Sequence, residues 1–163
     1  WSRGDQVTLR FPMEVRSSRW YGGSAVIERG PLVYALKMEE KWEKKAFESE
    51  RQDQYGPYYH TVTTDDPWNY AFRLKDIGKE NLASGFKVEV KEIGDAYPWN
   101  LENAPVSIKV KAVVLRNWEE YNGSTGPVAY YNEVGGDTGD EVWIELVPYG
   151  CTTLRITEFP VRR

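Results

Sequence analysis

Residues 142–156 read VWIELVPYGCTTLRI, and this stretch decides the fold class. From Val142 to Leu146 every second residue is aliphatic, which is the period of a β-strand with one buried face. Pro148-Tyr149-Gly150 then predicts a turn, because proline and glycine favour the backbone angles that turns need. The chain continues into Leu154 and Ile156, so the stretch indicates a strand, a turn and a second extended segment.

The same two-residue period recurs through the rest of the chain. Several short segments are rich in β-branched and aromatic residues, which favour strands over helices, and glycine or proline separates them. Neither an internal repeat nor an alternation of strands with helices is visible. Eight or nine short strands of this kind predict an all-β fold, an antiparallel β-sandwich of jelly-roll-like form. Besides the stretch above, the predicted strands are residues 7–11, 25–27, 31–36, 68–74, 86–90 and 106–115.

The length of the chain, 163 residues, suits one compact domain. The composition is 40% hydrophobic and 28% charged, as in chains that build a core. We therefore predict a single β-sandwich domain over residues 1–163, since a sandwich cut between strands would expose unpaired edges. The alternative division assigns residues 1–38 to strands of a preceding sandwich and residues 39–163 to a C-terminal sandwich.

The net charge of the chain is -4, from 25 acidic and 21 basic residues. An acidic chain lacks the basic face that nucleic acids and anionic membranes require, so we predict neither partner. Its apolar runs are much shorter than the roughly 20 residues of a membrane-spanning helix. The sequence starts at Trp1 without an initiator methionine or a signal peptide, and we interpret it as a piece of a longer polypeptide.

Two stretches depart from the strand pattern. Residues 39–54 (EEKWEKKAFESERQDQ) are charged and favour helix, with Trp42 and Phe47 as the only large apolar side chains. They predict either a short helix across one end of the sandwich or a solvated connection. The solvated connection is favoured, because charge runs usually face water. Residues 121–140 contain five glycines and predict a long loop.

Residues with catalytic or metal-binding chemistry form no recognisable constellation. The acidic pairs Asp65-Asp66 and Glu119-Glu120 are sequence neighbours, so on a strand their side chains point to opposite faces and cannot flank one glycosidic bond. The only histidine, His60, lies beside tyrosines, and the chain has no Gly-x-Ser-x-Gly motif. Residues 135–141 match a calcium loop only weakly and indicate a glycine-rich turn. A single cysteine, Cys151, excludes a multi-thiolate zinc site and is expected to be a buried apolar side chain, so we predict no catalytic residue, metal or cofactor on this chain.

Aromatic residues are the strongest functional signal, with 7 tryptophans and 11 tyrosines. Aromatic rings stack on the C–H faces of sugars, while asparagine hydrogen bonds with their hydroxyl groups. The same side chains also pack into cores and against neighbouring domains, and packing is favoured because large aromatics are mostly buried. The candidate residues for carbohydrate or interdomain contact are Trp68, Asn69, Tyr70, Tyr97 and Trp99, and Tyr130-Tyr131 forms a further cluster.

Four segments resemble, in order along the chain, segments of one enzyme family. These segments are similar to the region that follows the catalytic domain in family 127-type glycoside hydrolases, the β-L-arabinofuranosidases and their relatives. They span nearly the whole chain, whereas the stretches around residues 39–54 and 122–139 match no motif of the family. The four segments are GDQVTLRFPM at residues 4–13, ERGPLVYAL at 28–36, WNYAF at 68–72 and PYGCTTLRITEFP at 148–160.

The resemblance implies that this chain is a non-catalytic accessory β-sandwich of a glycoside hydrolase. In that family a helical (α/α) toroid carries a catalytic glutamate, a cysteine nucleophile and zinc, and this domain would lie upstream of Trp1. Cys151 matches the closing PYGC motif rather than those cysteines, so no catalytic or zinc role transfers to it. The implied partners are the catalytic domain of the same polypeptide and arabinose-containing glycans, and the implied location is periplasmic or secreted.

Three functions make different predictions for the surface of the molecule. An accessory domain exposes an apolar patch where the catalytic domain packs. A carbohydrate-binding module, the alternative, exposes a row or cleft of aromatic side chains. A self-contained enzyme needs two carboxylates that converge in one pocket.

Overall fold

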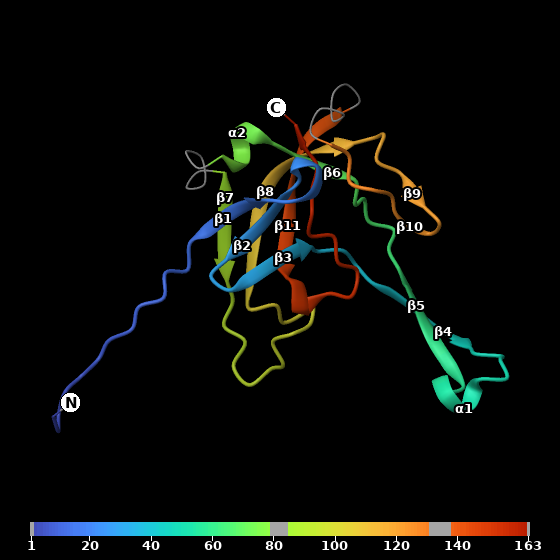
Figure 1. The fold of residues 1–163 in the computed structure, drawn as a ribbon, viewed down its shortest axis with the longest axis horizontal. Coiled ribbons are helices and arrows are strands. Elements are labelled where there is room, and N and C mark those ends of the chain that lie inside the picture. Colours follow the sequence, from blue (N-terminus) through green and yellow to red (C-terminus); the bar gives the residue numbers. More distant parts are fainter. Residues whose placement is uncertain (1, 79–84, 131–137, 163) are drawn as a thin grey trace.

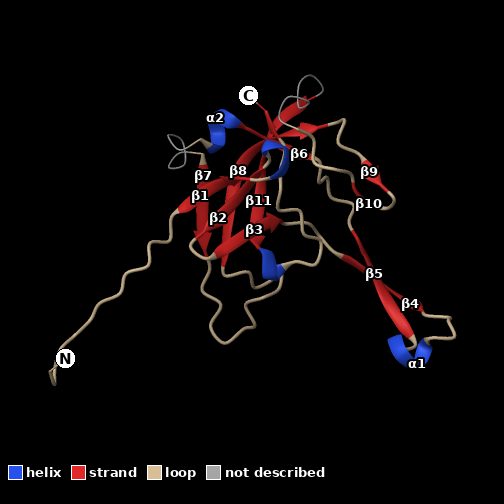
Figure 2. Cartoon of the chain, in the orientation of Figure 1, coloured by secondary structure: helices blue, strands red, loops and turns tan. Residues whose placement is uncertain are grey.

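The computed structural model describes residues 2–78, 85–130 and 138–162 of the chain (Figure 1). Strands predominate in these residues, and the helical segments are single turns (Figure 2). The predicted all-β fold is therefore confirmed. The helical turns are α1 (Gln52–Tyr55), α2 (Leu74–Ile77) and two 3-10 turns at Tyr21–Gly23 and Tyr149–Cys151. The strands are β1 (Val15–Arg19), β2 (Ala25–Arg29), β3 (Leu32–Leu36), β4 (Lys41–Ala46), β5 (Tyr58–Thr63), β6 (Tyr70–Arg73), β7 (Phe86–Val90), β8 (Val106–Leu115), β9 (Glu120–Tyr121), β10 (Ser124–Thr125), β11 (Thr138–Pro148) and β12 (Val161–Arg162).

Most of these strands join one curled sheet. Its order is β1-β2-β3-β11-β8-β6-β12, and β7 also pairs with β8. The described pairs of this sheet are antiparallel except that of β12 with β6. The sheet curls until its ends meet, since Ala25 in β2 and Phe159 before β12 exchange backbone hydrogen bonds of 2.8 and 3.0 Å. The two walls of the curled sheet thus enclose the main core, in a sandwich-like body (Figure 1). Ala71, Val113, Leu115 and Trp118 form a second, smaller apolar cluster.

Alternate residues of the central strands form the core. Ile108 and Val110 of β8 are fully buried, as is Leu146 on the neighbouring β11. This is the predicted two-residue period, in which successive side chains point to opposite faces of the sheet. Phe159 closes the core against Phe72, with ring centroids 4.6 Å apart. Burial of each of these side chains stabilises the fold by about 1.5–3 kcal/mol.

The strand predicted at residues 7–11 is wrong. These residues pair with no strand in the described part of the chain, and Figure 1 shows the N-terminal segment leading away from the body. The exposed fractions of Val7, Leu9 and Phe11 are 59%, 75% and 77%. Alternation in a sequence defines an apolar face, but a strand also needs a neighbouring strand to bond with its backbone, and this body supplies none.

The helix predicted as one possibility for residues 39–54 is wrong except for the single turn α1. Residues 41–46 form β4, which pairs with β5 from Lys41↔Thr63 to Ala46↔Tyr58. This two-stranded ribbon (residues 41–63, the arm) projects from the body (Figure 1). Helix propensity is a weak preference, and the backbone ladder with β5 overrides it. The other possibility, a solvated excursion, describes this stretch.

The predicted loop at residues 121–140 contains ordered pieces. The chain forms the small β9–β10 hairpin, and β11 already begins at Thr138. Residues 131–137, which include Tyr131 and the first three residues of the weak calcium match at 135–141, lie outside the described residues. Residues 154–156, predicted to follow the turn as an extended segment, form no strand, although the Ile156 carbonyl accepts a 2.8 Å hydrogen bond from the Leu36 amide.

Candidate functional site

A groove, called here the Trp68 groove, lies at the foot of the arm. Its walls come from three segments that are far apart in sequence: residues 62–64 of the arm, residues 120–125 of the β9–β10 hairpin and residues 153–156. Trp68 joins them in the lining. The volume of the groove is about 510 Å³, which lies within the range of small-molecule sites.

The predicted cluster at residues 68–70 divides between the core and this groove. Tyr70 is 8% exposed and belongs to the core. The Asn69 amide donates a 3.0 Å hydrogen bond to the Leu115 carbonyl, which ties the start of β6 to the end of β8. Trp68 is half-buried, packs edge-on against Trp118 with ring centroids 5.1 Å apart, and lines the groove. Of these three residues, Trp68 is therefore the one placed to meet a ligand.

The second predicted cluster, Tyr97 and Trp99, lies on the turn at residues 149–151. Tyr97 is 65% exposed and Trp99 is 42% exposed. A Cβ on Gly150 would lie 3.3 Å from the Trp99 ring, so the glycine lets this ring pack against the turn. The Cys151 thiol donates a 3.4 Å hydrogen bond to the Pro98 carbonyl. Neither aromatic side chain is in the lining of the Trp68 groove, so the structure does not bring the two predicted clusters into one site.

Glu40 fixes one wall of the Trp68 groove. Its carboxylate accepts hydrogen bonds from the Thr152 hydroxyl at 2.8 Å, from the Leu154 amide at 3.1 Å and from the Thr153 amide. The other carboxylate oxygen accepts a 3.1 Å hydrogen bond from the Trp42 indole. Burial alone would raise the pKa of Glu40, but these hydrogen bonds favour the ionised form and hold the pKa below its ordinary value.

The arm carries aromatic side chains on both faces. On one face, His60 lies between Trp42 and Tyr58, with ring centroids 5.8 and 5.6 Å away. The Lys44 ammonium lies 3.7 Å from the centre of the Tyr58 ring, a cation–π contact. Sequence reasoning missed this row, although alternate residues of 42–46 and 58–62 carry it, because residues 39–54 were not interpreted as a strand.

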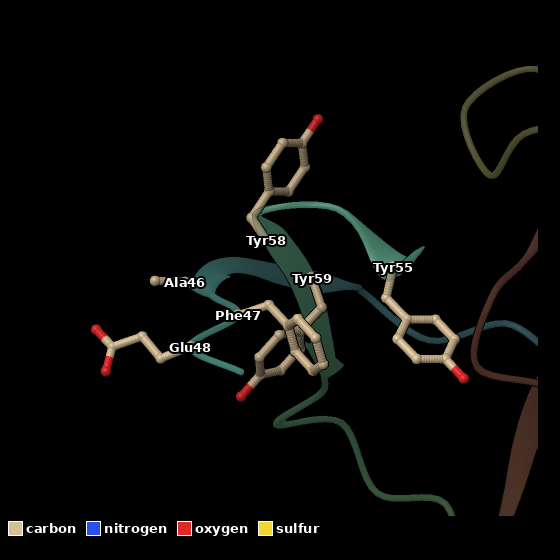
Figure 3. Close-up of a pocket in the computed structure, with 6 residues that line it drawn as sticks. All are labelled: Ala46, Phe47, Glu48, Tyr55, Tyr58 and Tyr59. Carbon is tan, nitrogen blue, oxygen red and sulfur yellow. The ribbon is translucent and has the colours of Figure 1, made fainter. Parts of the chain in front are cut away.

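The other face of the arm forms a second hollow. Phe47 packs edge-on against Tyr55 and Tyr59, with ring centroids 6.0 and 6.4 Å away. Figure 3 shows these three rings on one side of the ribbon, while Tyr58 points away from them. The hollow has a volume of about 620 Å³. It therefore exposes aromatic surface that no part of the described body covers.

The candidate catalytic groups make structural contacts. Asp65 pairs with Lys41, and the Asp66 carboxylate accepts a 2.7 Å hydrogen bond from the Glu39 amide. The Cys151 thiol is buried, which raises its pKa and disfavours the reactive thiolate. Across residues 2–78, 85–130 and 138–162, no group of three or more His, Cys, Asp or Glu side chains is placed to hold a metal ion.

No described helix has the length and apolar character needed to span a membrane. Comparison of the chain with protein-family models, with curated proteins and with solved structures gave no match in any of the three.

Proposed function

We propose that this chain is a non-catalytic accessory β-sandwich of a glycoside hydrolase related to the β-L-arabinofuranosidases. In this proposal it packs against the helical catalytic (α/α) toroid of the same polypeptide and stabilises it. The observation that carries the proposal is the uncovered apolar face of residues 7–11. An accessory domain requires such a surface where its partner docks.

Residues 7–11 have the pattern of a strand whose sheet lies elsewhere. Their three apolar residues alternate in sequence, so in a paired strand the three side chains would point to one side. The segment is held to the body at Met13, since a Cβ on Gly30 would lie 2.5 Å from the Met13 sulfur, and Gly30 has a φ of +57°. A strand that is anchored at one end and apolar on one face is suited to extend the sheet of a preceding β-sandwich, which in this proposal lies between the helical toroid and this body.

The arm supplies a second docking surface. A two-stranded ribbon is marginally stable in water unless it packs on something else. Trp42 and Tyr58 on one face, and Tyr55 and Tyr59 on the other, are each about half exposed. Their burial against a partner would stabilise both the arm and the contact.

In this proposal the chemistry belongs to the toroid. The catalytic glutamate, the cysteine nucleophile and the zinc that the resemblance implies have no counterparts on this chain, so the fragment alone is not an enzyme. The structural contacts of Asp65, Asp66 and Cys151 agree with that assignment. A periplasmic or secreted location follows from the implied substrate, an arabinose-containing glycan.

The test of this proposal is the sequence encoded directly upstream of Trp1 in the parent gene. We expect several hundred residues with helical periodicity that contain a glutamate and clustered cysteines. A signal peptide that ends close to Trp1 would overturn the proposal and would leave a free-standing module.

Carbohydrate binding is the second candidate function, and the position of Trp68 favours it. This half-buried indole lines a groove of about 510 Å³, and an aromatic ring at a partly open groove is a common element of sugar recognition. Binding of arabinose-containing oligosaccharides to the isolated chain tests it, and no binding to any of them would remove it.

A further inference from the structure

We propose that the Trp68 groove binds a short neutral oligosaccharide, with one sugar ring beside Trp68 and a second ring in the hollow that continues the groove. This inference rests on the second candidate function above, and it specifies the site, the size of the ligand and its chemical class.

The lining of the groove has the mixed character that a sugar ring needs. It combines apolar side chains, among them Trp68 and Leu154, with the hydroxyl side chains of Thr63, Ser124 and Thr125. A sugar ring offers C–H groups to apolar and aromatic surface, and its hydroxyl groups exchange hydrogen bonds with side-chain hydroxyls. Ser124 and Thr125 are neighbours on β10, so their side chains point to opposite faces of the hairpin. Thr125, which is exposed and lines the groove, is the hydroxyl that this inference assigns to the ligand.

The charges of the groove favour a neutral ligand. The lining holds one carboxylate, that of Glu120, and one guanidinium, that of Arg155. A phosphate or an acidic peptide would meet as much negative as positive charge there. A carboxylate and a guanidinium also form charge-assisted hydrogen bonds with hydroxyl groups, and a carbohydrate presents such groups at high density.

A second hollow makes the site long enough for two rings. This hollow has a volume of about 380 Å³ and shares Thr125, Arg155 and Ile156 with the Trp68 groove. Tyr21 and the buried Trp118 belong to its lining. Because three residues line both hollows, the hollows are neighbours, and this inference assigns the second sugar ring of a disaccharide to the smaller one.

The walls of the groove are held in place before any ligand arrives. Glu40 bonds with residues 152–154 as described above. The Arg155 Nε donates a 2.8 Å hydrogen bond to the Thr152 carbonyl, and its guanidinium lies 4.5 Å from the centre of the Tyr149 ring. Walls that are already fixed lower the entropy lost on binding, which suits weak ligands such as sugars.

Titration of the 163-residue chain with arabinobiose, xylobiose and cellobiose, followed by two-dimensional ¹H–¹⁵N NMR, tests this inference. We expect saturable shifts of the Trp68 indole N–H signal and of the Ser124 and Thr125 amides, with a dissociation constant of about 1 mM for the best ligand. The backbone amides of Tyr55 and Tyr59, near the tip of the arm and absent from the lining of the groove, report binding elsewhere, and their signals should stay in place.

Substitutions at the rim of the groove test whether the NMR shifts arise from binding in the groove. Thr125→Val should weaken binding about tenfold by loss of a hydrogen bond to the ligand. Glu120→Gln should weaken it by about the same factor, because a neutral amide replaces the charge-assisted acceptor. Both residues are exposed, so the folded state should persist. Glu119→Gln is the matched control, because Glu119 is also exposed but is absent from the lining, and it should bind like the unmodified chain.

The possible outcomes test the location of the binding site and the carbohydrate-binding function separately. Saturable binding that shifts the Tyr55 and Tyr59 amides and resists the rim substitutions would overturn the groove while leaving carbohydrate binding in place on the arm. Absence of saturable shifts with all three sugars would overturn both. Neither result bears on docking to a catalytic domain, which the upstream sequence tests.

Discussion

Glu40 joins the foot of the arm to the Trp68 groove through one carboxylate. It accepts hydrogen bonds from a hydroxyl and two backbone amides of residues 152–154, and from the Trp42 indole. Replacement of the carboxylate by a neutral amide leaves those donors with a weaker hydrogen-bond acceptor. We therefore expect Glu40→Gln to lower the free energy of unfolding at pH 7 by about 1 kcal/mol, measured by urea denaturation. The exposed Glu50→Gln is the control and should change nothing measurable.

The same contact makes stability depend on pH. Hydrogen bonds to the ionised form hold the pKa of Glu40 below its ordinary value of 4.5, against the opposing effect of burial. The stabilisation is therefore present above pH 4.5 and is lost as the pH falls through the lowered pKa of the folded state. The difference in unfolding free energy between the original chain and Glu40→Gln should narrow from pH 7 to pH 3. An equal difference at both pH values would contradict this assignment.

Single residues also show which structural features a sequence pattern can predict and which it cannot. The two-residue period places Tyr70 on the same strand face as Phe72, and both are buried. The period cannot say that Trp68, just before β6, lines a groove, because the other walls come from residues 62–64, 120–125 and 153–156. Contacts between segments that distant in sequence depend on the whole topology, so composition and spacing alone do not predict them.

At the scale of elements, substitutions in the N-terminal segment distinguish a role in docking from a role in folding. Leu9 and Phe11 are largely exposed, so Leu9→Asp and Phe11→Asp together should leave the melting temperature of the isolated chain within about 1 °C of its original value. The pair should also reduce aggregation at high concentration, because an exposed apolar strand promotes association. Differential scanning calorimetry and light scattering measure these two effects. A clear fall in melting temperature would mean that the segment packs on its own body.

The arm should be the first part of the body to open. Its two strands bond only to each other in the described chain, and its tip at residues 48–56 is largely exposed. Brief trypsin treatment should cut after Arg51 before it cuts after Lys109 or Lys111 in β8, since local stability is lowest where few apolar contacts are buried. Mass spectrometry of the fragments identifies the first cut. A first cut within the central strands would contradict this order.

The bounds of some strands in the main sheet could be predicted from the sequence. β7 and β8 have the predicted bounds, residues 86–90 and 106–115. In β8 the apolar residues Ile108, Val110 and Ala112 alternate and face the core, whereas in β7 only Phe86 is buried and the strand is defined by its pairing with β8. Residues 39–54 have the composition of a solvated helix, yet Lys41–Ala46 pair with β5. Local preference is worth only a few tenths of a kcal/mol per residue for most of these side chains, so a complete backbone ladder decides the outcome.

At the scale of the whole molecule, Phe159 closes the curled sheet. It is fully buried, packs on Phe72 and bridges to Ala25. Phe159→Ala should lower the free energy of unfolding by about 3–5 kcal/mol, from lost burial and the cavity left behind. Urea denaturation measures this change in the free energy of unfolding. Val90→Ala is the control, because Val90 is exposed at the end of β7, and its effect should stay below about 0.5 kcal/mol. Similar losses of unfolding free energy in Phe159→Ala and Val90→Ala would contradict the claim that Phe159 closes the sheet.

The central claim, that residues 7–11 join a sheet outside this body, is tested most directly by amide hydrogen exchange of residues 6–11. The exchange is compared between the 163-residue chain and the longer polypeptide that the proposal requires. We predict exchange within seconds in the 163-residue chain and strong protection in the longer polypeptide, because backbone amides of a paired strand exchange only when the sheet opens. Equally fast exchange in both would contradict the account.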